Sequence, residues 1–213
     1  MKTERSIEHV PSGKAIGIDV GLKAYLSDSD GNTVENPRHY RKAEQKLKRL
    51  HRHLSRKKKG SQNRKKARKA LAKGYLKVQR QREDFARKQA NALVSSHDLI
   101  AYEHLQIRTM VRNRHLAKSI HDAGWGLFVR WLTYYGLLHA IPIVAVPPHY
   151  TTQDCSACGT RVKKTLSVRT HICPGCGVVL DRDHNAALNI LQEALSSIRG
   201  GTVGHMETDR LAL

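Results

Sequence analysis

Two pairs of cysteines give the sequence its clearest local chemistry. They are spaced as C-x2-C-x14-C-x2-C, and the four residues are Cys155, Cys158, Cys173 and Cys176. Each two-residue spacing lets two thiolates of one tight turn reach the same tetrahedral ion, and the glycine after each pair permits the positive φ that such a turn needs. Because four thiolates complete a zinc shell, we predict a structural zinc site rather than a catalytic one. Two disulfides, or four unligated thiols, are the alternatives.

Three histidines lie near these residues in the sequence, namely His149, His171 and His184. A complete set of four cysteines needs no further ligand. His184 also follows Asp183 directly, so at the start of a helix its side chain would point elsewhere. We therefore leave all three histidines out of the predicted metal site.

A second group of residues suited to metal chemistry is acidic. Asp19 lies in a strand-like segment, Glu103 ends another, and Asp183 begins the last helix-like segment. If those two strands are neighbours and the helix start packs on their edge, the three carboxylates converge. Converging carboxylates repel one another unless divalent cations neutralise them, and oxygen ligands suit Mg²⁺ or Mn²⁺. Two such ions, about 3.5–4 Å apart, can promote phosphodiester hydrolysis.

Each of these acids also has an ordinary structural explanation. Asp19 could open a turn, and Glu103 could be a surface acid at the end of a strand. Asp181 or Asp183 could cap the following helix. Taken together in a strongly basic chain, however, the three acids favour a common site.

The positive charge is concentrated in one segment. The chain has 38 Lys/Arg and 18 Asp/Glu and a formal net charge of +20. Residues 38–90 contain 22 of the basic residues and 3 of the acidic ones, so the rest of the chain is almost neutral. A solvated helix face is the alternative, but such a segment would repel itself without a polyanion, and neutralisation of nucleic-acid phosphates is the simpler explanation. Aromatic residues are few there, so base stacking is not the expected mode.

The segments that position these residues follow strand and helix patterns. Apolar residues predict strands near residues 16–20, 25–26, 33–35, 97–105 and 141–146. Helical spacing predicts a hairpin over the basic segment that breaks at Gly60-Ser61 and continues over about 63–95, a helix over about 117–139, and a final helix at 185–195. Three meandering strands followed by strands that alternate with helices predict an α/β fold, a mixed sheet flanked by helices.

Composition also bears on the compartment. The sequence has no apolar run long enough to span a membrane and no apolar signal core at its start. We therefore expect a cytoplasmic, nucleoid-associated prokaryotic protein with no membrane partner. Thiols stay reduced in that compartment, which favours metal ligation over disulfides.

Several motifs, taken in order, resemble one known family. The stretches GIDVGL, LIAYEHL and YTTQDCSACG…HICPGCGVVLDRDHNAALNIL are similar to the C-terminal half of the OrfB/TnpB proteins of bacterial insertion sequences, which are related to compact type V CRISPR effectors. The resemblance covers about residues 14–195. It implies an RNase H-like (RuvC) nuclease domain with a basic helical hairpin insertion and an inserted zinc ribbon.

The resemblance also assigns residues and boundaries. It implies that Asp19, Glu103 and Asp183 are the catalytic acids, with Asp181 the less favoured choice, and that the four cysteines hold the ribbon's zinc. We expect an N-terminal remnant at 1–14, the nuclease domain at 15–149 with the basic hairpin at about 40–95, the ribbon at 150–178, a final helix at 179–195 and a flexible tail at 196–213.

Two functions of different classes follow from these features. The first is a divalent-metal DNA endonuclease, which the resemblance implies is directed by a guide RNA bound through an N-terminal half found in family members. The second is a non-catalytic nucleic-acid-binding remnant or regulator. A transposase proper fits less well, because the resemblance is to an accessory protein of transposons. Convergence of the three acids would favour the first function.

Overall fold

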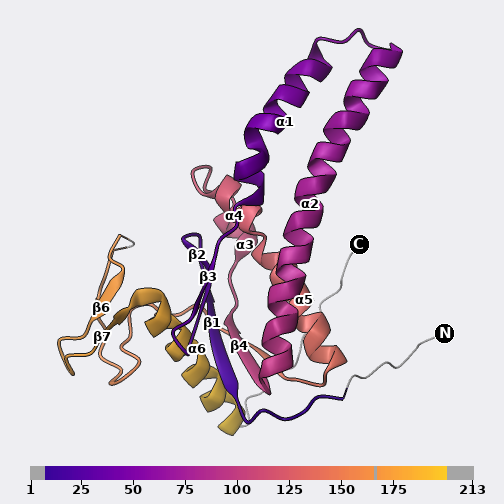
Figure 1. Cartoon of the computed structure of the whole chain (residues 1–213). Helices are drawn as coiled ribbons and strands as arrows, with labels where there is room; N and C mark the ends of the chain where they lie inside the picture. The colour runs from indigo at the N-terminus through magenta and orange to yellow at the C-terminus, as the bar shows by residue number, and fades with distance from the viewer. Residues whose placement is uncertain (1–7, 166, 201–213) are drawn as a thin grey trace.

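A five-stranded mixed sheet forms the centre of the molecule, as the computed structural model shows for residues 8–165 and 167–200 (Figure 1). Its strands are β1 (Ala15–Val20), β2 (Ala24–Asp28), β3 (Thr33–Glu35), β4 (Leu99–Glu103) and β5 (Ile143–Val146), in the order β3-β2-β1-β4-β5. The first three strands form an antiparallel meander, whereas β4 pairs in parallel with both β1 and β5. The five predicted strands and the mixed sheet are confirmed.

Helices cover both faces of this sheet. The helices of the described residues are α1 (His39–Ser55), α2 (Gln62–Ser96), α3 (Ile107–Met110), α4 (Ala117–Ala123), α5 (Trp125–Leu138) and α6 (Arg182–Arg199). Two short strands, β6 (Thr170–Ile172) and β7 (Val179–Asp181), form a separate antiparallel pair beside the start of α6 (Figure 1). No described helix is both long and apolar enough to cross a membrane.

Some helix boundaries differ from the sequence-based expectation. The single helix expected over 117–139 is wrong, because Gly124 adopts φ 69° between α4 and α5 and turns the chain there. The short α3 was not expected. The last helix begins at Arg182, one residue before Asp183, and continues to Arg199, so residues 196–199 of the expected tail are helical. Residues 201–213 of that tail lie outside the described residues.

The two faces of the sheet pack against different partners. Large side chains on one face, including Ile16, Ile18 and Ile100, join residues of α2 and α5 in the main core. On the opposite face Ala101 packs with residues of α6, among them Ile190. The sheet is therefore sandwiched between α2 and α5 on one side and α6 on the other.

Gly17 allows α6 to approach the sheet closely. A Cβ atom at this position would lie 2.2 Å from the Ala187 carbonyl oxygen and 2.8 Å from the Leu191 backbone nitrogen. Both neighbours are backbone atoms, so no side-chain rotation relieves the clash. The absence of a side chain in the middle of β1 therefore fixes the height of α6 above the sheet.

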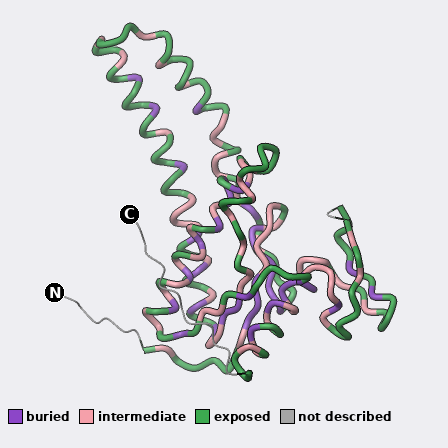
Figure 2. The backbone as a smooth tube through the Cα atoms, turned by 180° about the vertical axis from the view of Figure 1, so that it is seen from behind, coloured by how far each residue is buried: buried purple, intermediate pink, exposed green. Residues whose placement is uncertain are grey.

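The basic hairpin of α1 and α2 projects from the sheet and has a small core of its own (Figure 2). Leu47, Leu71 and Val78 are its buried apolar residues, which agrees with the helical hairpin predicted for this segment. Gly74 permits the crossing, because a Cβ there would lie 3.0 Å from Leu47 Cδ2. The outer surface is mostly exposed and carries the positive charge, so the projection presents cations to solvent (Figure 2).

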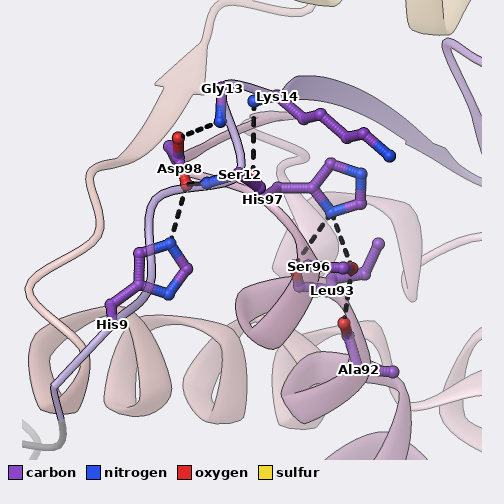
Figure 3. A network of polar contacts seen from close by, with 9 residues as sticks. All are labelled: His9, Ser12, Gly13, Lys14, Ala92, Leu93, Ser96, His97 and Asp98. Atoms are coloured by element: carbon purple, nitrogen blue, oxygen red, sulfur yellow. Dashed lines mark hydrogen bonds and ion pairs between the residues drawn. The ribbon is translucent and has the colours of Figure 1, made fainter.

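A hydrogen-bond network fixes the chain where it leads into the sheet (Figure 3). The Asp98 carboxylate, just before β4, accepts from His9 Nε2 at 2.7 Å, from the Ser12 backbone nitrogen at 2.8 Å and from the Gly13 backbone nitrogen at 2.6 Å. Hydrogen bonds to Ser12 and His9 hold the pKa of Asp98 well below its usual range. This ionised carboxylate ties the segment before β1 to the start of β4.

The contact at Gly17 yields a stability prediction. We expect Gly17→Ala to lower the free energy of unfolding by about 1–3 kcal/mol, because the added methyl group forces α6 away from the sheet. Urea unfolding followed by circular dichroism measures this change.

The matched control is Gly126→Ala in α5, where the nearest atom to an added Cβ is Ile107 Cδ1 at 3.7 Å. That substitution should be neutral or stabilising, because alanine favours a helix over glycine. Equal effects of the two substitutions would contradict the close approach of α6.

Candidate metal centres

Asp19 and Glu103 lie side by side at one end of the sheet. The last paired residues of β1 and β4 are Ile18 and Tyr102, and the same parallel register places Asp19 next to Glu103 one residue further on. Side chains alternate along a strand, so Asp19 shares the face of Gly17, against which α6 packs. The two acids therefore face α6 together.

Asp183 reaches the same place from α6. The helix crosses β1 with Ala187 above Gly17, and Asp183 stands one helical turn before Ala187. Asp19 stands two residues after Gly17, about 6.6 Å further along β1. One helical turn advances α6 by about 5.4 Å, so the two distances nearly match. The crossing thus brings Asp183 toward the two strand acids.

The electrostatics of Asp19 reflect this convergence. Burial raises the pKa of Asp19 well above its usual range, and the negative charges of Glu103 and Asp183 raise it further. Burial also raises the pKa of Glu103, although a hydrogen bond from Thr151 opposes the rise. The charges of Glu103 and Asp183 therefore disfavour the ionised form of Asp19, and a bound cation would relieve that repulsion.

Each neighbouring acid has a defined partner. Thr151 Oγ1 donates to Glu103 Oε1 at 2.9 Å. Asp183 Oδ1 accepts from Arg182 Nε at 3.0 Å and from Arg182 Nη2 at 2.9 Å, and Asp183 Oδ2 lies 3.5 Å from Arg169 Nη1. Asp181 Oδ1 accepts from the Asp183 backbone nitrogen at 2.8 Å and so caps α6. Asp181 thus has a structural role, whereas Asp183 faces charged groups.

The three carboxylates lie in one region, but their oxygen atoms do not all lie within 4.8 Å of one another. Within residues 8–165 and 167–200, the four cysteines are the only group of three or more potential ligand side chains whose ligand atoms all lie within 4.8 Å of one another. Oxygen-only donors with mutual repulsion suit Mg²⁺ or Mn²⁺ chemically. A cation that also used Asp183 would have to compete with Arg182 for its carboxylate. The assignment of the three acids as catalytic remains a prediction.

The four sulfur atoms have the spacing of a zinc site. Cys155 Sγ lies 3.7 Å from Cys176 Sγ, and Cys158 Sγ lies 3.5 Å from Cys173 Sγ. Sulfur atoms around a tetrahedral zinc, with Zn–S bonds of about 2.3 Å, stand about 3.8 Å apart. A disulfide bond is only about 2.05 Å long, and all four cysteines are free thiols. The arrangement fits one tetrahedral ion with no place for a catalytic water.

Two matching turns build this cluster. In the first, the Gly159 backbone nitrogen donates to the Cys155 carbonyl at 2.8 Å, and in the second Gly177 donates to Cys173 at 2.9 Å. Both glycines have φ 75°, as predicted from their positions after the cysteine pairs. Hydrogen bonds with the hydroxyl and backbone of Thr160 lower the pKa of the Cys158 thiol to about 6. The first turn therefore favours the thiolate form of Cys158, the form in which a cysteine binds metal.

The histidines near the cluster have other contacts. His171 is buried and contacts Lys164 Nζ through its Nδ1 atom. His184 Nε2 lies 3.2 Å from the Ser29 carbonyl oxygen, against β2. His149 is exposed. None of the three belongs to the cluster of cysteine ligand atoms among the described residues, which agrees with their omission from the predicted site.

Amide side chains of α6 clamp the ribbon to the helix. Asn185 Oδ1 accepts from the Ser156 backbone nitrogen at 3.1 Å, and Asn185 Nδ2 donates to the Asp154 carbonyl at 2.8 Å. Asn189 Nδ2 donates to the carbonyls of Asp154 and Thr151, each at 2.7 Å. Side chains of the helix that carries Asp183 thus hold the backbone of the first cysteine turn.

These clamp residues were missed in the sequence-based prediction, although a signal was present. Asn185 and Asn189 are four residues apart in the NAALN stretch, so they share one face of the helix. Asn185 is fully buried, and a buried amide needs polar partners. Thr151, which also contacts Glu103, was likewise not predicted as a site residue.

Comparisons with known proteins agree on one family. The OrfB_IS605 family model, described as "Probable transposase", matches residues 1–114. The model described as "Cas12f1-like, TNB domain" matches residues 125–190. A Streptomyces pristinaespiralis protein named as an RNA-guided DNA endonuclease is 37% identical over 185 residues, which cover 86% of this chain and 46% of that protein.

A second relative matches a similar share of the chain. An Escherichia coli (strain K12) protein named as the RNA-guided DNA endonuclease InsQ is 32% identical over 197 residues, covering 85% of this chain and 49% of that protein. The chain therefore spans about half the length of these curated relatives.

Solved structures share the fold. One, of a Cas12f1-sgRNA-target DNA complex, has a TM-score of 0.54 at 21% identity and covers 87% of this chain and 51% of that one. Another, of the mini-RNA-guided endonuclease CRISPR-Cas_phi3, has a TM-score of 0.55 at 12% identity and covers 89% and 48%.

Repulsion at the carboxylates predicts that removing one charge stabilises the metal-free protein. Because the folded protein raises the pKa of Asp19, ionised Asp19 destabilises the fold above the carboxyl's ordinary pKa of about 4. We expect Asp19→Asn to raise the melting temperature at pH 7 without divalent cations, by about 2–4 °C for each kcal/mol of repulsion relieved.

The gain should shrink as the pH falls toward 4, since protonation then removes the repulsion in the unsubstituted protein. Differential scanning calorimetry across this pH range tests the expectation. An Asp19→Asn protein that melts below the unsubstituted protein at pH 7 would contradict it.

The amide clamp predicts an effect on metal affinity. We expect Asn185→Ala to weaken cobalt(II) binding at the cysteines by roughly 10-fold to 100-fold, because it frees the turn that holds Cys155. The cobalt–thiolate absorption bands measure the affinity. Gln192→Ala, which removes one exposed hydrogen bond to the Ser156 carbonyl, is the control and should change the affinity much less. Equal affinities for all three proteins would exclude a clamp that supports the metal site.

Proposed function

The chain belongs to the OrfB_IS605 family, and on that premise we propose that it carries the nuclease part of an RNA-guided DNA endonuclease. Relatives about twice as long are named for this activity. Of the two solved structures with the same fold, one is titled as a Cas12f1 complex with sgRNA and target DNA, and the other as an RNA-guided endonuclease. The reaction we propose is metal-dependent hydrolysis of a DNA phosphodiester bond. One observation carries this proposal, namely that neighbouring strand ends and the start of α6 bring Asp19, Glu103 and Asp183 into one electrostatic environment.

The three carboxylates would hold Mg²⁺ or Mn²⁺. When bound, two such ions supply an activated water and a stabilised leaving oxygen. Asp19, on the central strand, would be the ligand that both neighbours can share. Glu103 is held in place by the hydrogen bond from Thr151, so its carboxylate is oriented before any ligand arrives. Arg182 and Arg169 hold Asp183 and balance its charge.

Zinc in the ribbon would have a structural role. The four cysteines fill its coordination shell and leave no position for substrate. The ribbon packs on the first turns of α6 through Asn185 and Asn189, so metal binding would order the segment that contains Thr151. We therefore propose that the zinc stabilises the positions of Glu103 and Asp183 and takes no part in the reaction itself.

The basic hairpin would neutralise nucleic-acid phosphates. Its exposed surface carries most of the chain's excess positive charge, and phosphate contacts of this kind carry no sequence information by themselves. Sequence selection would then come from base pairing with a guide RNA, as the names of the longer relatives imply. DNA and guide RNA are accordingly the partners that we propose.

A second function, nucleic-acid binding without cleavage, has one observation in its favour. Asp183 Oδ1 is engaged by two nitrogen atoms of Arg182, and Arg169 lies near its other oxygen. If those arginines hold Asp183 more strongly than a cation does, the chain binds nucleic acid but does not cleave it. The cation dependence of cleavage separates the two functions.

The test is Mg²⁺-dependent cleavage of labelled single-stranded DNA. We expect Asp19→Ala to lower the rate at least about a hundredfold, since it removes a ligand of the ions that activate water. Asp30→Asn, at the exposed β2–β3 turn, is the matched control and should cleave normally. Equal cleavage by the Asp19→Ala protein would refute the assigned site. DNA binding without cleavage, even after addition of the N-terminal half of a relative, would favour the second function.

A further inference from the structure

A basic cleft lies on the opposite side of the β1–β2 turn from α6. It has a volume of about 500 Å³ and lies between that turn, the end of β3, the start of α1 and the helix α4. Its lining residues are Leu22, Lys23, Asn36, Arg38, Arg41, Ser119 and Asp122. Three of these seven are cationic, and they come from two separate parts of the cleft wall.

The cationic side chains are not neutralised within the described chain. Lys23 and Arg38 are exposed, and within residues 8–165 and 167–200 their side chains make no hydrogen bond or ion pair. Arg41 Nη2 donates to Ser119 Oγ at 3.0 Å, which is a neutral partner. The cleft therefore has three cationic side chains, none of which forms an ion pair with a described residue.

The one acid of the cleft is committed elsewhere. Asp122 is buried, and its two carboxylate oxygens accept from the backbone nitrogens of Tyr40 at 2.7 Å and Arg41 at 3.0 Å. These bonds cap the start of α1, so the N–H groups of Tyr40 and Arg41 are already satisfied. The anion affinity of the cleft must then come from its side chains.

The cleft wall is fixed by a buried amide. Asn36 Nδ2 donates to the Leu22 carbonyl at 3.1 Å, and Asn36 Oδ1 accepts from the Arg38 backbone nitrogen at 3.2 Å. Arg38 adopts φ 49°, a left-handed conformation that a residue with a side chain rarely takes. Strained backbone of this kind is common at binding sites. Asn36 thus joins Arg38 to the turn that carries Lys23, and together they form one wall of the cleft.

The cleft opens at the same end of the sheet as the carboxylates. β1 runs from Asp19 directly into the turn with Lys23, and β3 runs in the same direction as β1 because both are antiparallel to β2. A nucleic-acid strand that lies across the carboxylates can therefore continue over this edge. Its phosphates are the polyanion that the cleft would meet.

We propose that this cleft binds a backbone phosphate of the DNA strand that enters the carboxylate site. This inference rests on the proposed function, and it adds a substrate-positioning site made by Lys23, Arg38 and Arg41. The chemical class of the ligand is a phosphodiester, held by charge and by guanidinium hydrogen bonds. Such a site would fix the register of the strand relative to the carboxylates.

The test measures DNA binding rather than cleavage. Fluorescence anisotropy of a labelled oligothymidylate, without added Mg²⁺, gives Kd across a range of salt concentrations. We expect Lys23→Gln combined with Arg38→Asn to weaken binding roughly tenfold at 0.1 M salt and to reduce the slope of log Kd against log salt by about 0.7, because the contact with one phosphate is lost. Asparagine is chosen at position 38 because it tolerates the left-handed backbone.

The matched control removes the same charge at the other end of the sheet, through Lys14→Gln and Arg199→Gln. Lys14 precedes β1 and Arg199 ends α6. This protein should keep the original salt slope. Equal losses in both double variants would show that only net charge matters and would overturn the proposal.

A direct readout is the side-chain Nε–Hε signal of Arg38 in the nuclear magnetic resonance spectrum during titration with a five-nucleotide thymidylate. A shift that saturates with binding supports the site, and an unmoved signal while other signals shift overturns it. Because neither measurement requires turnover, a chain that never cleaves DNA can still pass both. A chain that cleaves DNA but fails them would refute this inference alone.

Discussion

The contact between α6 and the centre of β1 determines where the acidic groups meet. Gly17 leaves room for the backbone of α6, and the adjacent Ala101 on β4 is also small. Asp19 and Glu103 follow these two residues on the same face, and Asp183 stands one turn above the contact. A larger residue at position 17 would move the helix, and the three carboxylates would no longer share one environment.

That arrangement is electrostatically unfavourable by itself, and the rest of the structure stabilises it. Burial and mutual repulsion oppose ionisation of Asp19, so the folded chain holds charges that would separate if the helix were free to move. The amide clamp of Asn185 and Asn189 attaches the helix to the ribbon, and Thr151 links the ribbon to Glu103. The four-cysteine module thus supports a group of acids whose charges repel, which is a common arrangement where function requires strain.

Local patterns were sufficient for part of this picture. The cysteine spacing predicted both the cluster and the positive φ of Gly159 and Gly177, because ligands of one turn are set by neighbouring residues. Alternating apolar residues located the strands. The pairing of the acids needed the resemblance to a known family, since the sequence alone does not state that β1 and β4 are neighbours. Contacts between distant residues escaped prediction, among them the cap of α1 by Asp122 and the network around Asp98, because no local pattern specifies a partner more than eighty residues away.

The central claim is that the three carboxylates form a divalent-cation site, and a crystal structure with Mn²⁺ tests it most directly through the anomalous signal of the ion. We predict an anomalous peak between Asp19 and Glu103, with the Asp183 carboxylate turned from Arg182 toward the ion. A structure at saturating Mn²⁺ with no peak at these residues, and with Asp183 still paired to Arg182, would contradict it.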